Sequence, residues 1–502
     1  MNARPHSLSR QEDPVSGPLP YRRNALKLAL SLCCALTFHC IPFEGLSPQA
    51  HGVLTTLLFM TLVWVTEAVS YPASAFFLII SMTLFTAFSS TGEGGVLGTR
   101  NALSAALNGF KSGAWFLVVA ALSLAGAIQQ TGLGQRMALL MLVRVGANPR
   151  RVRGGILAMC FILTLFIPAQ AANAVLMTAV CSGLLDVLSI KRQSNFAKGL
   201  MLAVAFGCPM AGMGVLTSGA PPIQTADLIA QATGHTISWL EWMLYGMPFS
   251  LTVGLVLFVL LEWRFPVQAD TLSGQGDVIR SELEKLGPAN PREKRLLCVM
   301  CCTILLWATG GLLHGLDNST IALMAVGAMF LPGISITTWE ELSRTISWGT
   351  LLLFGGAISL GQSLLTTGAA AWVAENTIVR LGVAAWHPAA IVGAAAFFFA
   401  LFSLAFSARA AAVAALVPTV IGFAQALPET PGLSVWGLTL ISYYAIQFAV
   451  ILPVNTPMSM VAYSTATFSA REMARIGFPL CLTAIMLIVA FSQTYWRWVG
   501  VL

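Results

Sequence analysis

Charged residues are scarce in this sequence. Asp, Glu, Lys and Arg together make up 9% of its 502 residues, whereas hydrophobic residues make up 57% and the mean hydropathy is +0.78. Soluble globular proteins carry about a quarter charged residues, so the composition excludes that class. We expect an all-α, polytopic membrane protein.

The sequence also lacks the patterns that catalysis and metal or nucleotide binding require. Its ten cysteines lie mostly inside apolar segments, without the spacing of metal ligands. It has no phosphate-binding loop, no nucleic-acid-binding signature and no soluble domain large enough for an ATPase. We therefore expect no enzymatic activity, no metal site, no cofactor and no nucleic-acid partner.

The amino-terminal segment does not have the pattern of a secretory signal. Residues 1–23 are polar, and the apolar segment that follows has no small-residue cleavage motif. We interpret 1–23 as a cytoplasmic tail that precedes a retained first helix. The net charge of +7 is attributed to the enrichment of Lys and Arg in cytoplasmic loops.

Apolar runs long enough to cross a hydrocarbon core of ~30 Å recur along the chain. Two long runs, 197–230 and 435–466, are broken by Gly, Pro, Ser and Thr. Two others, 156–186 and 388–425, contain small polar residues near the middle and are interpreted as re-entrant hairpins. Together with the uninterrupted runs they predict about eleven transmembrane helices plus two hairpins, with the amino terminus in the cytoplasm. This topology places most of the 27 basic residues on the cytoplasmic side, as the positive-inside rule requires.

The chain divides into two halves that resemble each other. Ser123-Leu124 followed by Thr131-Gly132 matches Ser359-Leu360 followed by Thr367-Gly368, and the same alignment pairs the broken segments 214–222 and 448–464. We predict a first half (24–263), a cytoplasmic linker (264–294) and a second half (295–502) that crosses the membrane in the inverted direction. Inverted repeats with broken helices in corresponding positions are typical of secondary transporters.

The broken segment 448–464 has backbone groups that a regular helix cannot satisfy. Pro453 and Pro457 remove backbone donors, so carbonyls near 449–453 lose their helical partners. Unpaired backbone at membrane depth is tolerated only where it faces protein or a water-filled cavity. The segment is therefore a candidate ligand or ion site.

Several motifs resemble those of the divalent anion:sodium symporter family, over residues 45–500. They are Trp64-Val-Thr-Glu67, Thr217-Ser-Gly-Ala-Pro-Pro222, Trp348-Gly-Thr-Leu-Leu-Leu-Phe-Gly-Gly356 and Leu452-Pro-Val-Asn-Thr-Pro457. The first loop is similar to the branch of citrate, dicarboxylate and tartrate carriers. The resemblance implies a homodimeric, elevator-type carrier in which substrate carboxylates and two sodium ions bind between the hairpin tips and the broken-helix loops.

The chain departs from the family pattern at both hairpin tips. The resemblance implies a Ser-Asn-Thr tip in each hairpin, but these positions read Ala169-Gln170-Ala171 and Ser407-Ala408-Arg409. Most of the hydroxyl and amide groups that would bind substrate and sodium are therefore missing. This difference puts sodium coupling into question.

Arg409 is the most informative candidate, because a charge at membrane depth costs several kcal/mol and almost always faces a cavity or a partner. We expect it to receive a substrate carboxylate through its planar fork. The alternative is a guanidinium that is paired with carbonyls. The other predicted substrate contacts are polar residues of the tips and loops: Asn173, Thr217, Ser218, Ser407, Asn455 and Thr456. Candidate cation ligands are Gln170, Gly219 and Pro453. For Glu67 a proton relay competes with a structural role at a helix end.

The sequence thus predicts a secondary active transporter of small organic anions, with di- or tricarboxylates as substrates, in a bacterial inner membrane. Exchange or proton coupling is expected from the altered tips. One alternative is a sodium-coupled dicarboxylate or sulfate symporter, with Na⁺ as the coupling ion. Another is a transport-inactive membrane sensor or partner subunit. The expected partners are the anion, membrane lipids and a second copy of the chain.

Overall fold

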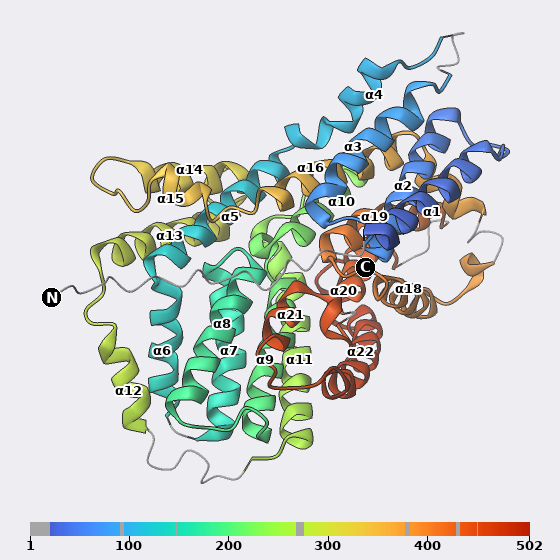
Figure 1. Ribbon diagram of the computed structural model, residues 1–502. Coiled ribbons are helices and arrows are strands. Elements are labelled where there is room, and N and C mark those ends of the chain that lie inside the picture. Colours follow the sequence, from blue (N-terminus) through green and yellow to red (C-terminus); the bar gives the residue numbers. More distant parts are fainter. Residues whose placement is uncertain are drawn as a thin grey trace.

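The structure, a computed structural model, describes residues 21–90, 95–146, 148–267, 276–376, 382–427, 432–448 and 450–502. Almost all of the predicted cytoplasmic tail lies outside these residues. Within the described parts the regular elements are helices, as expected, and the chain forms no extended strand there (Figure 1).

The first half contains eleven α-helices. They are α1 (Tyr21–Cys40), α2 (Pro48–Thr66), α3 (Tyr71–Ala87), α4 (Thr99–Ala106), α5 (Gly113–Thr131), α6 (Leu133–Val145), α7 (Pro149–Phe166), α8 (Gln170–Val187), α9 (Asn195–Met213), α10 (Ala220–Thr233) and α11 (Trp239–Arg264). The first hairpin is formed by α7 and α8, so it begins several residues before the predicted position 156.

The described parts of the linker and of the second half are also helical. Their helices are α12 (Gly276–Lys285), α13 (Pro291–Thr309), α14 (Asn318–Phe330), α15 (Trp339–Ser343), α16 (Trp348–Thr366), α17 (Ala369–Ala374), α18 (Pro388–Ser403), α19 (Arg409–Ala426), α20 (Val435–Gln447), α21 (Pro457–Tyr463), α22 (Ala470–Gln493) and α23 (Tyr495–Trp498). Part of the predicted linker is therefore helical, as α12. The second hairpin, α18 and α19, matches the predicted range.

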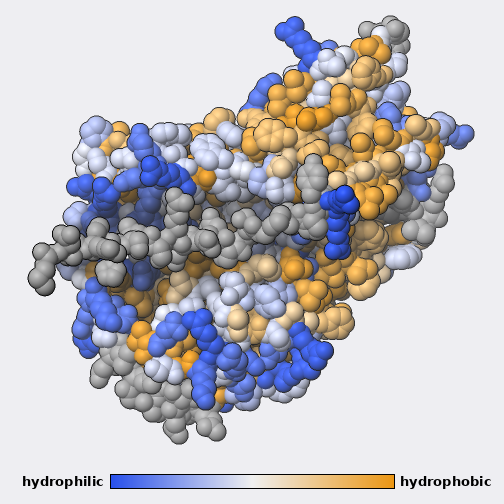
Figure 2. All heavy atoms as spheres, viewed as in Figure 1, coloured by the Kyte–Doolittle hydropathy of each residue, from blue (hydrophilic) through white to orange (hydrophobic). Residues whose placement is uncertain are grey.

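Eight helices of the described chain are long and apolar enough to cross a membrane. They are α2, α5, α8, α9, α11, α16, α19 and α22, the last extended by α23, and three shorter apolar helices are α3, α14 and α18. Two of the eight, α8 and α19, are hairpin arms. The count of eleven crossings therefore stays a prediction. In Figure 2 the hydrophobic surface gathers over α1–α4 and α18, and hydrophilic side chains gather below α7, α9 and α11.

The two halves pack against each other reciprocally. Helix α5 packs on α14, and α16 packs on α3. Likewise α8 of the first hairpin packs on α21, and α19 of the second hairpin packs on α10. Each hairpin also contacts the long part of the broken helix in its own half, α9 or α20. This exchange of partners is the arrangement expected of an inverted repeat.

The breaks in the two long helices follow from their sequences. α9 ends at Met213, a short 3-10 turn spans Leu216–Ser218, and α10 starts with Pro221 and Pro222 in its first turn. α20 ends at Gln447, a 3-10 turn spans Pro453–Asn455, and α21 starts at Pro457. Proline is tolerated in the first turn of a helix, where its missing N–H has no helical partner. The prolines therefore mark the restart of each helix.

Candidate functional site

Arg409 is the first residue of α19 and lies at the tip of the second hairpin. Its side chain is buried, and it donates hydrogen bonds to the carbonyls of Asn455 (2.8 and 3.1 Å), Ile446 (2.9 Å), Phe406 (2.9 Å) and Ser403 (3.3 Å). Two of these carbonyls belong to the hairpin tip and two to the broken helix. The guanidinium therefore joins the tip to the loop, and the geometry favours the interpretation in which Arg409 is paired with carbonyls.

Asn455 and Thr456 stabilise the second loop from inside. The Asn455 side-chain oxygen accepts from the N–H groups of Ile451 (3.2 Å) and Leu452 (2.7 Å), and its amide donates to the carbonyl of Leu404 (3.2 Å). Thr456 caps α21 by accepting from the N–H of Ser459 (3.0 Å). Both side chains are buried. Their polar groups are thus used within the loop and at the hairpin.

The first hairpin docks on its own loop in a similar way, but without a charge. Gln170, the first residue of α8, donates from Nε2 to the hydroxyl of Ser218 (3.1 Å), which donates to the carbonyl of Gly212 (2.6 Å). Gly212 leaves room for this contact, because a Cβ at that position would lie 1.7 Å from the Gln170 amide nitrogen and would displace the side chain. Gln170 and Arg409 are each the first residue of the second hairpin helix, so they have equivalent positions in the structure, one residue away from the alignment of the two tips in the sequence.

Asn173 and Thr217 lie near the first tip. Asn173 donates to the carbonyl of Cys160 and to the hydroxyl of Thr164, both at 3.0 Å, and its own side-chain oxygen has no partner in the described chain. The hydroxyl of Thr217 accepts from Trp239 Nε1 at 3.1 Å. Asn173 therefore has a buried side-chain oxygen that is free to accept a hydrogen bond from a ligand.

The amino-terminal ends of three helices at the tips lack a side-chain cap. The residues before α8, α10 and α19 are Ala169, Gly219 and Ala408, and none makes a capping hydrogen bond with its side chain. Because Gln170 contacts Ser218, the ends of α8 and α10 lie close together. Ala171 is exposed and Gly219 is half-buried, so this pair of ends is accessible. Uncapped N–H groups at a helix amino terminus attract anions.

Ser407 faces the first half of the chain, away from the loops. Its hydroxyl donates to the carboxylate of Glu67 and is hydrogen-bonded to the hydroxyl of Tyr71. Glu67 ends α2 with a φ of 51°, which agrees with a structural position at a helix end. Sequence reasoning placed Ser407 with the substrate contacts and missed Tyr71. The Trp64-Val-Thr-Glu67 motif, which ends four residues before Tyr71, was the sequence feature that could have indicated a functional role for this region.

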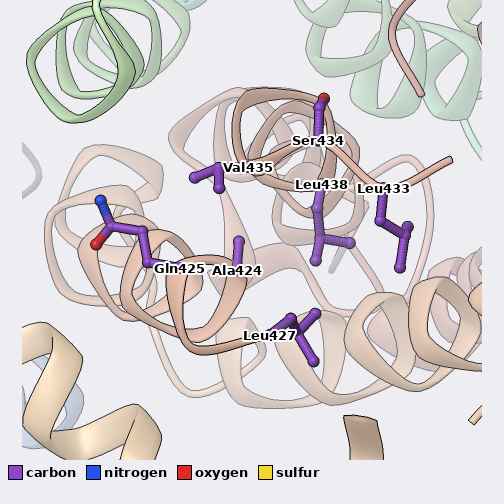
Figure 3. Close-up of a pocket in the computed structure, with 7 residues that line it drawn as sticks. All are labelled: Ala424, Gln425, Leu427, Leu433, Ser434, Val435 and Leu438. Atoms are coloured by element: carbon purple, nitrogen blue, oxygen red, sulfur yellow. The ribbon is translucent and has the colours of Figure 1, made fainter. Parts of the chain in front are cut away.

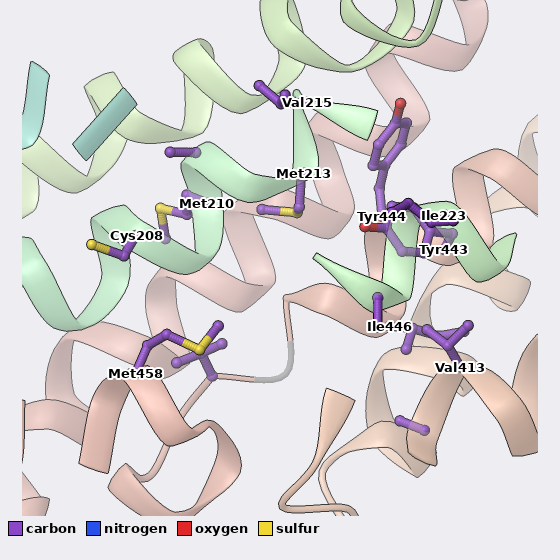
Figure 4. Close-up of a cluster of buried hydrophobic side chains, with 14 of the residues drawn as sticks. Cys208, Met210, Met213, Val215, Ile223, Val413, Tyr443, Tyr444, Ile446 and Met458 are labelled. Carbon is purple, nitrogen blue, oxygen red and sulfur yellow. The ribbon is translucent and has the colours of Figure 1, made fainter. Parts of the chain in front are cut away.

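The space between the broken helices is filled by apolar side chains. Figure 4 shows Met213, Ile223, Val413, Ile446 and Met458, from both halves, around this junction. In this dry environment an unpaired charge is costly, and Arg409 avoids that cost through its carbonyl partners. Pro453 is buried in the 3-10 turn here, and Gly219 has extended backbone.

The larger cavities lie away from the broken-helix loops. One of about 510 Å³ is lined in part by Lys198, Tyr463 and Glu472. A second, of about 260 Å³ at the far end of α19, is lined among the described residues by Gln425, Ser434 and apolar side chains (Figure 3). Another, of about 270 Å³, lies between α5 and the first hairpin and is lined in part by Gln129, Gln135, Ile167 and Ala172. In the described part of the chain no cluster of His, Cys, Asp and Glu has the arrangement of a metal site.

Helices broken in inverted pairs and docked by two hairpins define a multi-pass membrane transporter. The family described as "Sodium:sulfate symporter transmembrane region" matches residues 22–502, and the chain belongs to this family. The sequence-based assignment to the anion:sodium symporters is thereby confirmed. The members of this family are transporters and not enzymes.

Among curated relatives, a "Membrane protein" of Cupriavidus necator is 33% identical over 459 residues, covering 91% of this chain and 89% of that protein. The "Sodium-dependent dicarboxylate transporter SdcS" of Staphylococcus saprophyticus is 25% identical, covering 89% and 86%. The "L-tartrate/succinate antiporter" of Escherichia coli is 24% identical, covering 78% and 80%.

Two solved transporters share the fold at low sequence identity. The YdaH transporter of Alcanivorax borkumensis aligns with a TM-score of 0.57 and 15% identity, covering 88% of this chain and 98% of that one. The MtrF efflux pump of Neisseria gonorrhoeae aligns with a TM-score of 0.53 and 12% identity, covering 95% of both chains. These similarities support the predicted fold class.

Proposed function

We propose that this protein is a secondary carrier of small organic anions, with dicarboxylates as the main substrates, working by alternating access across a bacterial inner membrane. The observation that carries the proposal is the docking of each hairpin tip on a broken-helix loop in both halves. The names of the relatives, a sodium-dependent dicarboxylate transporter and a tartrate/succinate antiporter, agree with it.

The anion site we propose is centred on the first tip. The end of α8 presents uncapped N–H groups there, the start of α10 adds at most the N–H of Ala220 because Pro221 and Pro222 have none, and Asn173, Thr217 and Ser218 are buried close by. Asn455 and Thr456 shape the corresponding loop of the second half. Main-chain N–H groups can bind a carboxylate without the Ser-Asn-Thr side chains, which explains how a carrier can function with altered tips.

Arg409 has the role of a built-in cation in this proposal. Carbonyl oxygens from a hairpin tip and a broken helix are the ligands that a hard cation such as sodium takes. Here the guanidinium has these ligands, so a sodium ion is not needed at the second tip. We therefore propose anion exchange or proton coupling in place of two-sodium symport. Sodium-coupled symport of dicarboxylate or sulfate is the alternative that the name of the staphylococcal relative favours.

The moving parts follow from the packing. We propose that both hairpins, with α9–α11 and α20–α22, slide as a unit against α1–α5 and α13–α16, in a homodimer with the amino terminus in the cytoplasm. The boundaries 24–263, 264–294 and 295–502 remain the proposed halves and linker.

Counterflow in proteoliposomes tests the proposal. Labelled succinate should accumulate when the lumen contains unlabelled succinate, tartrate or citrate, and replacing sodium by choline should leave the rate nearly unchanged. A complete loss of uptake in choline would refute exchange and establish the sodium-coupled alternative. Absence of uptake, and of any thermal stabilisation by carboxylates or sulfate, would leave a transport-inactive sensor or partner subunit.

A matched pair of variants locates the anion site. Ala171→Asp places a carboxylate in front of the ends of α8 and α10 and should abolish uptake by repulsion and competition. Gly183→Asp, near the other end of the same helix, is exposed, and a Cβ there meets nothing within 4 Å. It should transport like the wild type. Equal loss of uptake in both variants would mean that any acidic residue in α8 is harmful. Wild-type uptake in both variants would show that the anion site is not at the first tip.

A further inference from the structure

The second hairpin tip contacts the unit that contains α2 and α3 through a series of hydrogen-bonded side chains. Ser407 donates to the Glu67 carboxylate, which can only accept, so Tyr71 donates its hydroxyl hydrogen to Ser407 in preference to the more distant Trp64 carbonyl, at 3.4 Å. Glu67 and Tyr71 flank the corner between α2 and α3, whereas Ser407 belongs to the hairpin. This series therefore bridges the two units that the proposed function moves against each other.

The corner is built to present these groups. Glu67 adopts a φ of 51°, a left-handed conformation that is uncommon for residues other than glycine, asparagine and aspartate. Such a conformation costs energy and persists where the surrounding structure holds it. Trp64 contributes to the corner, since its indole donates to Ser74 (2.9 Å), whose hydroxyl donates to the carbonyl of Tyr71 (2.7 Å). These two hydrogen bonds tie the end of α2 to the first turn of α3.

The contact is suited to break and re-form. Glu67 is exposed and Ser407 is only half-buried, so water can replace each partner when the tip leaves. In contrast, Arg409 is buried two residues away and stays with the broken helix of its own unit. Undocking would therefore separate Ser407 from Glu67 without disturbing the carbonyl cluster around Arg409.

We propose that Glu67 and Tyr71 form a docking latch for the second hairpin tip, with Ser407 as its movable partner, and that this latch stabilises the orientation seen in the structure. The proposal rests on the carrier function proposed above. It also reassigns Ser407 from a substrate contact to a residue that sets the population of one transport state.

Thiol accessibility tests the latch without requiring transport. In full-length protein with the exposed cysteines replaced by serine, Ala408→Cys places a thiol at the second tip and Ala171→Cys places one at the first. The replaced residues are Cys33, Cys34, Cys40, Cys298, Cys301 and Cys302. A water-soluble maleimide should react with the second-tip thiol about three- to tenfold faster after Glu67→Gln, a factor of ten being about 1.4 kcal/mol. This is below the usual contribution of a hydrogen bond to a charged group because Glu67 is exposed. Tyr71→Phe should act in the same direction. The first-tip thiol should be unaffected.

The controls separate the latch from general loosening and from the carrier function. Glu44→Gln removes an exposed carboxylate elsewhere in the first half and should leave both thiols unchanged. Unchanged reactivity at the second tip in Glu67→Gln and Tyr71→Phe would overturn the latch, and so would an equal increase at both tips. In proteoliposomes that exchange dicarboxylate, Ser407→Ala should change kcat at least threefold with little change in KM, whereas a substrate contact would raise KM. If wild-type exchange is absent the carrier proposal fails, and the thiol rates alone decide the latch.

Discussion

Removal of the Arg409 side chain is the perturbation that separates the two roles considered for this residue. If its guanidinium holds the hairpin tip on the broken helix, Arg409→Ala removes a donor from the carbonyls of Ser403, Phe406, Ile446 and Asn455. The carbonyls of Ser403 and Ile446 each keep one other donor, the Phe406 N–H and the Ser403 hydroxyl. The loss should then be one of stability. If instead the side chain bound the anion, the loss would be one of affinity alone.

The size of the effect follows from the hydrogen bonds. A hydrogen bond to a charged group contributes about 1.5–3 kcal/mol, but burying the guanidinium offsets much of the sum. Breaking a buried charged cluster by removing one partner costs about 3–5 kcal/mol, which is our expectation for Arg409→Ala. Arg409→Lys should cost roughly half as much, because an ammonium cannot reach both Asn455 and Ile446 in the geometry of the planar fork.

Thermal unfolding of the purified variants measures this loss, and added cations test its cause. Sodium or low-millimolar guanidinium should stabilise Arg409→Ala, because either ion can bind the vacated carbonyls, whereas the wild type should not respond. Gln170→Ala, the equivalent change at the neutral tip, serves as the control and should show no cation rescue. Wild-type stability of Arg409→Ala combined with lost anion affinity would refute the carbonyl-paired role.

Two other predictions rest on single contacts. Gly212→Ala should lower the unfolding temperature and weaken anion binding, because the new Cβ would displace the Gln170 amide from Ser218; Gly183→Ala, which has nothing within 4 Å, is its control. Arg136→Ala should speed proteolysis between α12 and α13, because Arg136 donates to the carbonyls of Leu286 (3.3 Å) and Gly287 (2.9 Å) and pairs with Glu293. The control there is Arg192→Ala, since its pair with Asp186 is exposed and contributes less than about 1 kcal/mol. Equal cleavage rates in both arginine variants would contradict this role of Arg136.

The sequence predicted the elements whose signal is local. Apolar length located the long helices, and Gly, Pro and Ser within those runs located both hairpins and both broken helices. The helix α12 was missed because its residues are mixed in charge and resemble a linker. α6 was missed because Arg136 and Arg144 interrupt its apolar face.

The direction of side chains at the tips was not predictable in the same way. The sequence indicated unpaired carbonyls near Pro453 and a buried donor at Arg409, and the structure brings such partners together at Ile446 and Asn455. For Ser407 the residue type suggested a ligand contact, but the tip places its hydroxyl toward Glu67. Periodicity gives the element on which a polar group lies, whereas its partner depends on how distant segments pack.

The two tips share one geometry and differ in charge. Gln170 and Arg409 each begin the second helix of a hairpin, follow an alanine in extended conformation, and donate to the loop of a broken helix. A neutral amide at one tip and a cation at the other break the electrostatic symmetry of the inverted repeat. The charge of a dianion bound at the first tip would then be balanced in part by the guanidinium of Arg409, which is part of the protein, and not by an ion taken from solution. A fixed charge is compatible with exchange, since the return step of an exchanger carries another anion. In a two-sodium symporter the same charge would occupy the place of one coupling ion.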